Sequence, residues 1–234
     1  MQATNDARDY TGIANLEVME EAVRYNDFLA RLVVSVAPRG GRLLDFGAGT
    51  GRFAGRLAAQ GFDVVCVEPD RRLRGELERK ALRATADIAE VPAGSMDAVY
   101  SLNVLEHIDD DAAALGELHR VLKPGGRLLL YVPAFMVLYS AMDHRVGHVR
   151  RCRKAPLAHL VRSAGFNVEE VRYADSLGFA ASIGLKIFGN PSGDLSPGTV
   201  RFYDRWLFPL SQALDRCLSG FVGKNLVLRS TRTG

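Results

Sequence analysis

The chain of 234 residues is 47% hydrophobic and 24% charged. This is the composition of a globular protein, which excludes disordered, collagen-like and low-complexity classes. The formal net charge of +3 is small for a protein that binds polyanions, so the charge balance argues against nucleic acid as a partner.

Short apolar runs alternate with amphipathic segments along the chain, a pattern typical of βαβ units and a parallel sheet. A helix is expected over residues 16–36, before the first strand. Strands with intervening helices then follow. The strands are expected at 42–46, 62–67, 83–86, 96–102 and 127–132, and the helices at 52–60, 71–82 and 109–122.

The C-terminal third begins with a helix expected at 155–163 and a strand at 166–173. Glycines and prolines then separate two apolar stretches within residues 175–222, which predicts a broken helix, a loop and a second helix. A final strand is expected at 225–230. Large apolar residues recur at helical spacing in the second helix, and we favour core or interface packing over a membrane-surface helix for this row of Trp206, Leu210, Leu214, Leu218 and Phe221.

Three features bear on the cellular location. Cys66, Cys152 and Cys217 are far apart, so they support neither a disulfide framework nor a cysteine metal site, and a reducing compartment is expected. The first ten residues lack the basic and apolar segments of a secretory signal. The longest uncharged run, residues 128–142, is shorter than the roughly 20 residues that span a bilayer. We therefore expect a cytoplasmic protein without a transmembrane segment.

The most informative feature is a glycine-rich turn between the first strand and its helix, which reads DFGAGTG over residues 45–51. Glycines let the backbone turn tightly and approach a ligand, and the following helix offers free N–H groups, so a nucleotide-type ligand is expected. A shifted G-x-G-x-x-A pattern from Gly49 to Ala54 leaves an NAD(P) dinucleotide as an alternative. Against it, the Asp45 carboxylate would face two phosphates. Glu68, at the end of the second strand, could accept the ribose hydroxyls of either ligand.

This turn is one of four ordered motifs: DFGAGTG with Glu68, Asp87 within TADIAEVP, MDAVYSLNVLEHI at 96–108 and LKPGGRLLLYVP at 122–133. Together they resemble class I S-adenosylmethionine-dependent methyltransferases, in particular the small-molecule group that contains the quinone-biosynthesis enzymes. The resemblance covers about residues 42–175. It implies an α/β fold with a Rossmann-like, seven-stranded, mostly parallel sheet, helices on both faces, an N-terminal cap helix and a C-terminal helical insertion before the last strand.

The resemblance also implies one methyltransferase domain over residues 1–234. Its parts would be a helical cap at 1–40, a cofactor-binding core at 41–174, a helical substrate-side insertion at 175–222, and the last strand and tail at 223–234. The implied activity is transfer of a methyl group from S-adenosylmethionine to an oxygen or nitrogen of a small acceptor. The alternatives are an NAD(P)-dependent oxidoreductase and a non-catalytic cofactor-binding partner protein.

S-adenosylmethionine carries a sulfonium and an ammonium but no phosphate, which agrees with an acid beside the glycine turn. For Asp87 the alternative role is a helix cap. The residues that the resemblance places at the cofactor are Asp45, Gly47, Ala48 and Gly49 at the methionine part, Glu68 at the ribose, Pro69, Asp87 and Ile88 at the adenine, Asn103 and Val104 close to the methionine part, and Tyr25 at its carboxylate.

The acceptor is expected to meet the segment after the fifth strand, because loops after strand ends form the ligand crevice of an α/β sheet. The charges of the chain are unevenly distributed, and this segment is basic. Residues 143–154 contain five bases and one acid, whereas residues 87–117 contain eight acids and no Lys or Arg. Guanidinium groups bind carboxylate or phosphate, which favours an anionic or lipid-linked acceptor. The expected acceptor contacts are Tyr139, Arg145, Arg150 and Arg151.

A base is needed where the acceptor arrives protonated, and histidine is a common choice. Asp143 could orient either His144 or His148 as this base, and His107 in the LEH motif is a further candidate. A metal on Asp143, His144 and His148 is the alternative, but the neighbouring arginines would surround the ion with positive charge, so no metal is expected. Peripheral membrane contact is compatible with the sequence, which does not indicate an oligomeric state.

Overall fold

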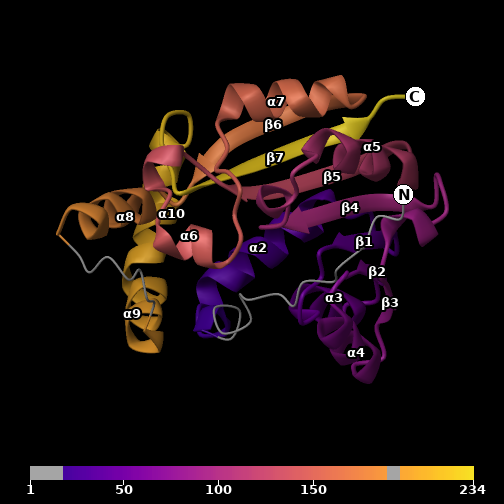
Figure 1. The fold of residues 1–234 in the computed structure, drawn as a ribbon, viewed down its shortest axis with the longest axis horizontal. Coiled ribbons are helices and arrows are strands. Elements are labelled where there is room, and N and C mark those ends of the chain that lie inside the picture. Colours follow the sequence, from indigo (N-terminus) through magenta and orange to yellow (C-terminus); the bar gives the residue numbers. More distant parts are fainter. Residues whose placement is uncertain (1–17, 189–195) are drawn as a thin grey trace, which may run out of the picture.

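The computed structural model describes residues 18–188 and 196–234. Its strands are β1 (Arg42–Phe46), β2 (Asp63–Val67), β3 (Arg83–Thr85), β4 (Met96–Leu102), β5 (Leu122–Pro133), β6 (Phe166–Ala174) and β7 (Asn225–Arg232). They form one sheet in the order β3-β2-β1-β4-β5-β7-β6 (Figure 1). Only β7 runs antiparallel to its neighbours, β5 and β6. The predicted seven-stranded, mostly parallel sheet is confirmed.

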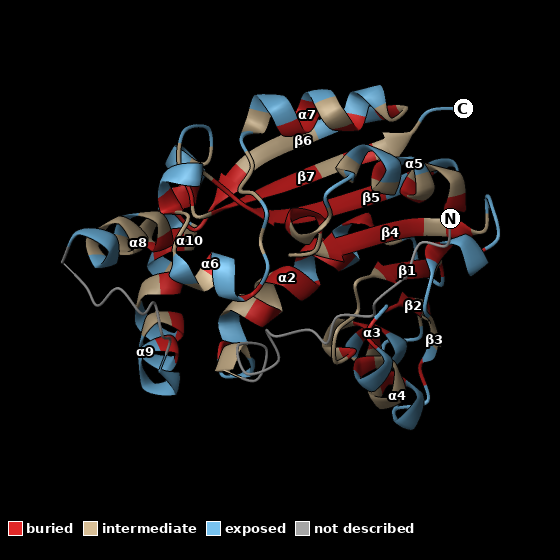
Figure 2. Ribbon diagram, viewed as in Figure 1, coloured by how far each residue is buried: buried red, intermediate tan, exposed pale blue. Residues whose placement is uncertain are grey.

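Helices cover both faces of this sheet, as predicted. One face carries α5 (Asp111–Val121) and α7 (Lys154–Ser163), and the other carries α2 (Val23–Val36), α3 (Arg52–Ala58) and α4 (Arg71–Arg79). Adjacent residues of β1 serve opposite cores, because Leu44 packs toward α5 and Leu43 toward α2. Figure 2 shows the central strands almost wholly buried, which explains why they appear in the sequence as short, mainly apolar runs.

The carboxyl ends of β4, β5 and β6 share an unusual backbone feature. Asn103, Phe135 and Asp175 follow these strands with φ angles of +56°, +60° and +66°. Non-glycine residues rarely adopt this left-handed conformation, and strained backbone of this kind is concentrated at ligand sites. The feature marks the same edge of the sheet at which the glycine turn follows β1.

Several element boundaries differ from those expected. The strand expected at 127–132 begins five residues earlier, because Leu122 already pairs with Met96 of β4 before a register shift. Asp110 caps α5, its side chain accepting the Ala113 N–H at 2.9 Å, so that helix starts at Asp111. Of the helix expected at 16–36, residues before 18 lie outside the described part, and α2 begins only at Val23. Short helical turns η1 (Ile88–Glu90), η2 (Leu105–His107), η3 (Met136–Leu138) and α6 (Ala141–Arg145) were not expected.

The described residues between β6 and β7 are mostly helical, as predicted, whereas most of the loop expected between the two helical parts falls on residues 189–195, which lie outside the described part. It consists of α8 (Ser176–Phe188), α9 (Pro197–Phe202), a π-helical turn η4 (Tyr203–Leu207) and α10 (Phe208–Leu218). The prediction that the apolar row packs in the core is wrong, because all five of its side chains, from Trp206 to Phe221, are exposed. Packing in an interface stays a prediction. Within the described residues, no helix combines the length and apolar character needed to cross a membrane.

Candidate functional site

The glycine turn is held by β2 and covered by the segment that follows β4. The N–H groups of Gly47 and Ala48 donate to the Val67 carbonyl at 2.9 and 3.2 Å. Gly47 has a φ of +81°, and a Cβ atom there would lie 2.4 Å from Cγ2 of Val104. Only glycine fits this position, so the turn and Val104 form a closely packed floor at the carboxyl edge of the sheet.

Two buried carboxylates flank this turn. Asp45 is 3% exposed, and its Oδ2 has no hydrogen-bond partner among the described residues. Glu68 is 7% exposed and accepts the N–H groups of Gly49 at 2.7 Å and Asp70 at 3.0 Å. Burial raises the pKa of Asp45 to about 7 and also raises the pKa of Glu68. A buried acid that lacks a partner suits a positively charged ligand group, because a cation would stabilise its ionised form.

The remaining residues predicted at the cofactor lie along the same edge, since they follow the ends of β2, β3 and β4. Pro69 directly follows Glu68. Asp87 caps η1 by accepting the Ala89 N–H at 2.9 Å, and Ile88 beside it is buried. The N–H of Asn103 donates to the Tyr131 carbonyl at 2.7 Å, which places the left-handed residue next to the floor of the turn.

Tyr25 is a packing residue in this structure. Its ring lies edge-on to Tyr131 and Phe208, with centroids 6.1 and 5.5 Å away, and burial raises its pKa to about 12. Its N–H and that of Arg24 donate to the Asp204 carboxylate at 2.8 and 2.9 Å. A contact between Tyr25 and the cofactor stays a prediction.

The loop after β5 contains an oriented histidine. Asp143 is 2% exposed and receives Arg151, with Nε to Oδ1 at 2.9 Å and Nη2 to Oδ2 at 3.0 Å, as well as the Ser140 N–H at 2.9 Å. Hydrogen bonds and charge from His148 and Arg151 hold the pKa of Asp143 well below its usual range, despite burial. His148 Nδ1 lies 2.7 Å from Asp143 Oδ1. Because Asp143 is anionic, we assign the proton of this contact to Nδ1, which leaves the Nε2 lone pair of His148 on the side of Glu106.

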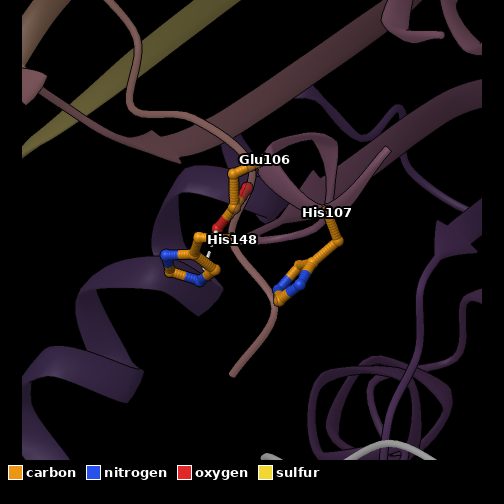
Figure 3. Close-up of side chains that lie close together, drawn as sticks. All are labelled: Glu106, His107 and His148. Carbon is orange, nitrogen blue, oxygen red and sulfur yellow. Dashed lines mark ion pairs between the residues drawn. The ribbon is translucent and has the colours of Figure 1, made fainter. Parts of the chain in front are cut away.

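Glu106 and His107 of η2 meet His148 from the other side, and Figure 3 shows the three side chains converging. Glu106 is fully buried, neither of its carboxylate oxygens has a hydrogen-bond partner among the described residues, and Oε1 lies 3.7 Å from His148 Nε2. Burial raises the pKa of Glu106 to about 8, and burial together with His148 lowers that of His107 to about 4. Both shifts favour the neutral forms of Glu106 and His107, as burial away from water does.

The same three side chains have the ligand types of a metal site, because their donor atoms lie within 4.8 Å of one another. This set differs from the Asp143, His144 and His148 set considered from the sequence. Asp143 is not part of the cluster of Glu106, His107 and His148 and instead contacts the other ring nitrogen of His148, Nδ1.

The structure separates other residues that the sequence grouped together. His144 is exposed at the end of α6, away from Asp143, and Arg145 beside it is also exposed. Arg150 pairs with Asp111 and donates to the Asp109 carbonyl at 2.8 Å. The Tyr139 hydroxyl donates to the His148 carbonyl at 2.6 Å and so holds the loop. The positive charge of the loop is thus partly neutralised within the protein.

Glu106 was missed as a site residue. It stands in the LEH motif beside His107, but a single acid after a strand carries no signal of burial. The loop creates that burial by folding back: the Val149 N–H donates to the Glu106 carbonyl at 2.9 Å.

A family model described as a methyltransferase domain matches residues 18–171 of the chain. An uncharacterized methyltransferase of Mycobacterium tuberculosis is 40% identical over 114 residues, which are 47% of this chain and 44% of that protein. The chain thus aligns with less than half the length of this relative. An uncharacterized methyltransferase of Mycobacterium leprae is 31% identical over 207 residues, which are 82% of this chain and 73% of its own length.

Among solved structures, a SAM-dependent methyltransferase of Thermotoga maritima superimposes with a TM-score of 0.63 at 20% identity. The superposition covers 94% of this chain and 95% of that protein. At this level of identity the likeness concerns the fold.

Proposed function

The chain belongs to the methyltransferase-domain family, and we propose that it transfers a methyl group from S-adenosylmethionine to an oxygen or nitrogen of a small-molecule acceptor. The observation that carries this proposal is the unpartnered, buried Asp45 oxygen beside the Gly47 turn. S-adenosylmethionine presents an ammonium and a sulfonium to this edge, and either would be attracted by the carboxylate.

A dinucleotide fits the turn less well. Its pyrophosphate would lie against two buried carboxylates, Asp45 and Glu68, which would repel its phosphates. The oxidoreductase alternative therefore lacks support.

The residues at the edge can be assigned to parts of the ligand. Asp45 would receive the ammonium, and the remaining lone pairs of Glu68 would receive the ribose hydroxyls. Asp87 and Ile88 would meet the adenine, and Asn103 and Val104 the methionine part. When bound, the sulfonium supplies a methyl carbon that is already activated for displacement.

On the acceptor side, His148 is the proposed general base. Asp143 holds its ring with Nδ1 protonated, and Nε2 takes the proton from the acceptor hydroxyl or amine as that atom attacks the methyl carbon. A bound S-adenosylmethionine would supply the methyl carbon, and the electron pair of its C–S bond would pass to sulfur, which would leave S-adenosylhomocysteine. Asp143 then stabilises the imidazolium, because its carboxylate lies 2.7 Å from Nδ1 of the ring. A non-catalytic binding protein would not need a positioned base, so this arrangement favours an enzyme.

The anionic-acceptor hypothesis receives less support from the geometry than from the sequence. Arg150 and Arg151, two of its four expected contacts, are paired with Asp111 and Asp143. We therefore propose that the acceptor is selected first by its transferable proton, and not by a negative charge.

A transfer assay tests the proposal. The full chain is incubated with methyl-labelled S-adenosylmethionine and a panel of hydroxyl and amine acceptors, and labelled products are identified by mass spectrometry. Transfer by the wild-type chain that is lost in His148→Ala and kept in the exposed-site control His144→Ala would support it. Tight NADH binding by a chain that fails to bind S-adenosylhomocysteine would overturn it.

A further inference from the structure

In the helical segment 196–222, the distribution of polar and apolar side chains is the reverse of that in an ordinary surface helix. Its inward side carries two acids and a serine beside apolar residues, whereas its outward side is a line of large apolar side chains. We call this line the outer row. It consists of Phe202, Trp206, Leu210, Leu214, Leu218 and Phe221, which are 59%, 61%, 53%, 37%, 37% and 79% exposed.

The burial of the two acids is explained by hydrogen bonds to the N-termini of two other helices. Asp204 accepts the N–H groups of Arg24 and Tyr25 at the start of α2, at 2.9 and 2.8 Å. Asp215 accepts those of Asp175 and Ser176 at the start of α8, at 2.7 and 2.9 Å. The first N–H groups of a helix lack partners within the helix, and its N-terminus favours negative charge. Both acids are therefore committed to the fold, but the outer row takes no part in these contacts.

The charge that remains on the outside of the segment is positive. Its acids, Asp204 and Asp215, are buried, whereas Arg201, Arg205 and Arg216 are exposed. The Arg205 guanidinium lies 5.3 Å from the centre of the Trp206 ring. Arg201 has one partner across the surface, Glu21 at 3.5 Å. The segment thus presents large apolar side chains flanked by arginines.

The neighbouring helix α8, which packs against α10, also carries exposed apolar side chains. Leu185 and Ile187 of α8 are 62% and 66% exposed. Figure 1 shows α8, α9 and α10 gathered at one end of the molecule, beyond the carboxyl ends of the strands. Exposed apolar side chains that gather in this way mark an interaction surface, whereas scattered ones do not.

We propose that the outer row is a membrane-docking face, which lies on the surface of a bilayer that contains anionic lipid. An amphipathic helix with Trp, Phe and Leu on one side and flanking Arg inserts its apolar side chains at the acyl boundary while its cations meet anionic headgroups. A second copy of the chain is disfavoured as the occupant, because two such faces would bring the same arginines together. The proposal is independent of the methyl-transfer reaction.

The chain contains one tryptophan, Trp206, which makes the test direct. The full chain is titrated with vesicles of phosphatidylcholine containing about one third phosphatidylglycerol, and with vesicles of pure phosphatidylcholine. With the anionic vesicles, we expect the Trp206 emission to shift to the blue and to become protected from acrylamide quenching. Binding to pure phosphatidylcholine should be much weaker, and added salt should weaken binding to the anionic vesicles.

Variants separate the apolar and charged contributions. Leu210→Ser with Leu214→Ser should weaken vesicle binding at least tenfold, because two large apolar groups are lost from the contact. Arg205→Gln and Arg216→Gln should each weaken it about fivefold on anionic vesicles only. Val34→Ser, at a valine of α2 that is 40% exposed outside the outer row, should leave binding unchanged. Circular dichroism of each variant reports whether it is folded.

Two results would overturn the proposal. One is an unchanged Trp206 spectrum with anionic vesicles at low salt. The other is a dimer in sedimentation that Leu210→Ser dissociates while vesicle binding stays absent, which would make the outer row an interface between copies of the chain.

Discussion

Binding of S-adenosylhomocysteine is expected to strengthen as the pH rises through neutrality, because Asp45 must lose a proton to pair with the ligand's ammonium. Burial, with a smaller contribution from the nearby Glu68, raises the pKa of Asp45 to about 7 although a hydrogen bond with Tyr100 lowers it. Cys66 and Tyr100 also face Asp45, but burial raises the pKa of both, so they stay neutral throughout this range. The relevant proton therefore belongs to the carboxyl pair.

The size of the effect follows from the ionised fraction of Asp45. A carboxyl with a pKa of about 7 is about nine-tenths ionised at pH 8 and about one-tenth ionised at pH 6. If the ligand binds only the ionised form, its affinity falls about tenfold between these pH values, which is about 1.4 kcal/mol. Burial also raises the pKa of Glu68, which acts in the same direction.

Isothermal titration of the full chain with S-adenosylhomocysteine at several pH values measures this dependence. Asp45→Asn keeps the size of the side chain but cannot ionise. This variant should bind at least tenfold more weakly at pH 8, as expected for a lost charge-assisted hydrogen bond, and should lose most of the pH dependence. Any titration of the ligand itself would persist in the variant. A wild-type affinity that does not change with pH, or an Asn variant with an unchanged slope, would refute the reasoning.

Four further predictions concern other parts of the site. His148→Ala should lower turnover about 10²- to 10⁴-fold without changing S-adenosylhomocysteine affinity, whereas His144→Ala should change neither; equal losses in both would indicate a structural effect of the loop. Gly47→Ala should lower both stability and cofactor affinity, as measured by urea unfolding and calorimetry, because its Cβ would collide with the floor of the turn. Glu106 should lower the free energy of unfolding as the pH rises from about 5 to about 8, because the folded chain holds a proton on Glu106 to about pH 8 that the unfolded chain releases near pH 4.5; the difference in pH-dependent unfolding between the wild-type chain and Glu106→Gln should show this slope, since Asp45, and His107 with its lowered pKa of opposite effect, titrate in both. Chelation should leave turnover unchanged, and a loss restored by added zinc or manganese would identify the cluster of Figure 3 as a metal centre.

The sheet could be predicted from the sequence because its strands are buried on both faces. The strand at Met96–Leu102 was predicted to the residue, since a short, mainly apolar run bounded by turn residues has few alternative structures. By contrast, the exposed row that includes Trp206 has the same helical spacing as a buried one. Its orientation is decided by distant partners, because Asp204 and Asp215 are drawn inward by the N-termini of two other helices.

The histidine that pairs with Asp143 could not be chosen from the sequence, since both His144 and His148 follow it closely. The structure decides because α6 ends at Arg145 and Gly147, with a φ of +83°, turns the chain back. This reversal brings His148 to Asp143 and leaves His144 exposed. Glu106 became part of the site only through the same reversal, because its burial depends on a loop far along the chain.

The most direct test of the account is calorimetric titration of the full chain with S-adenosylhomocysteine and, separately, with NADH at pH 8. The account predicts one S-adenosylhomocysteine bound per chain, with an affinity that falls at least tenfold in Asp45→Asn, and no NADH binding. Binding of NADH in preference to S-adenosylhomocysteine, or an S-adenosylhomocysteine affinity that does not depend on Asp45, would contradict it.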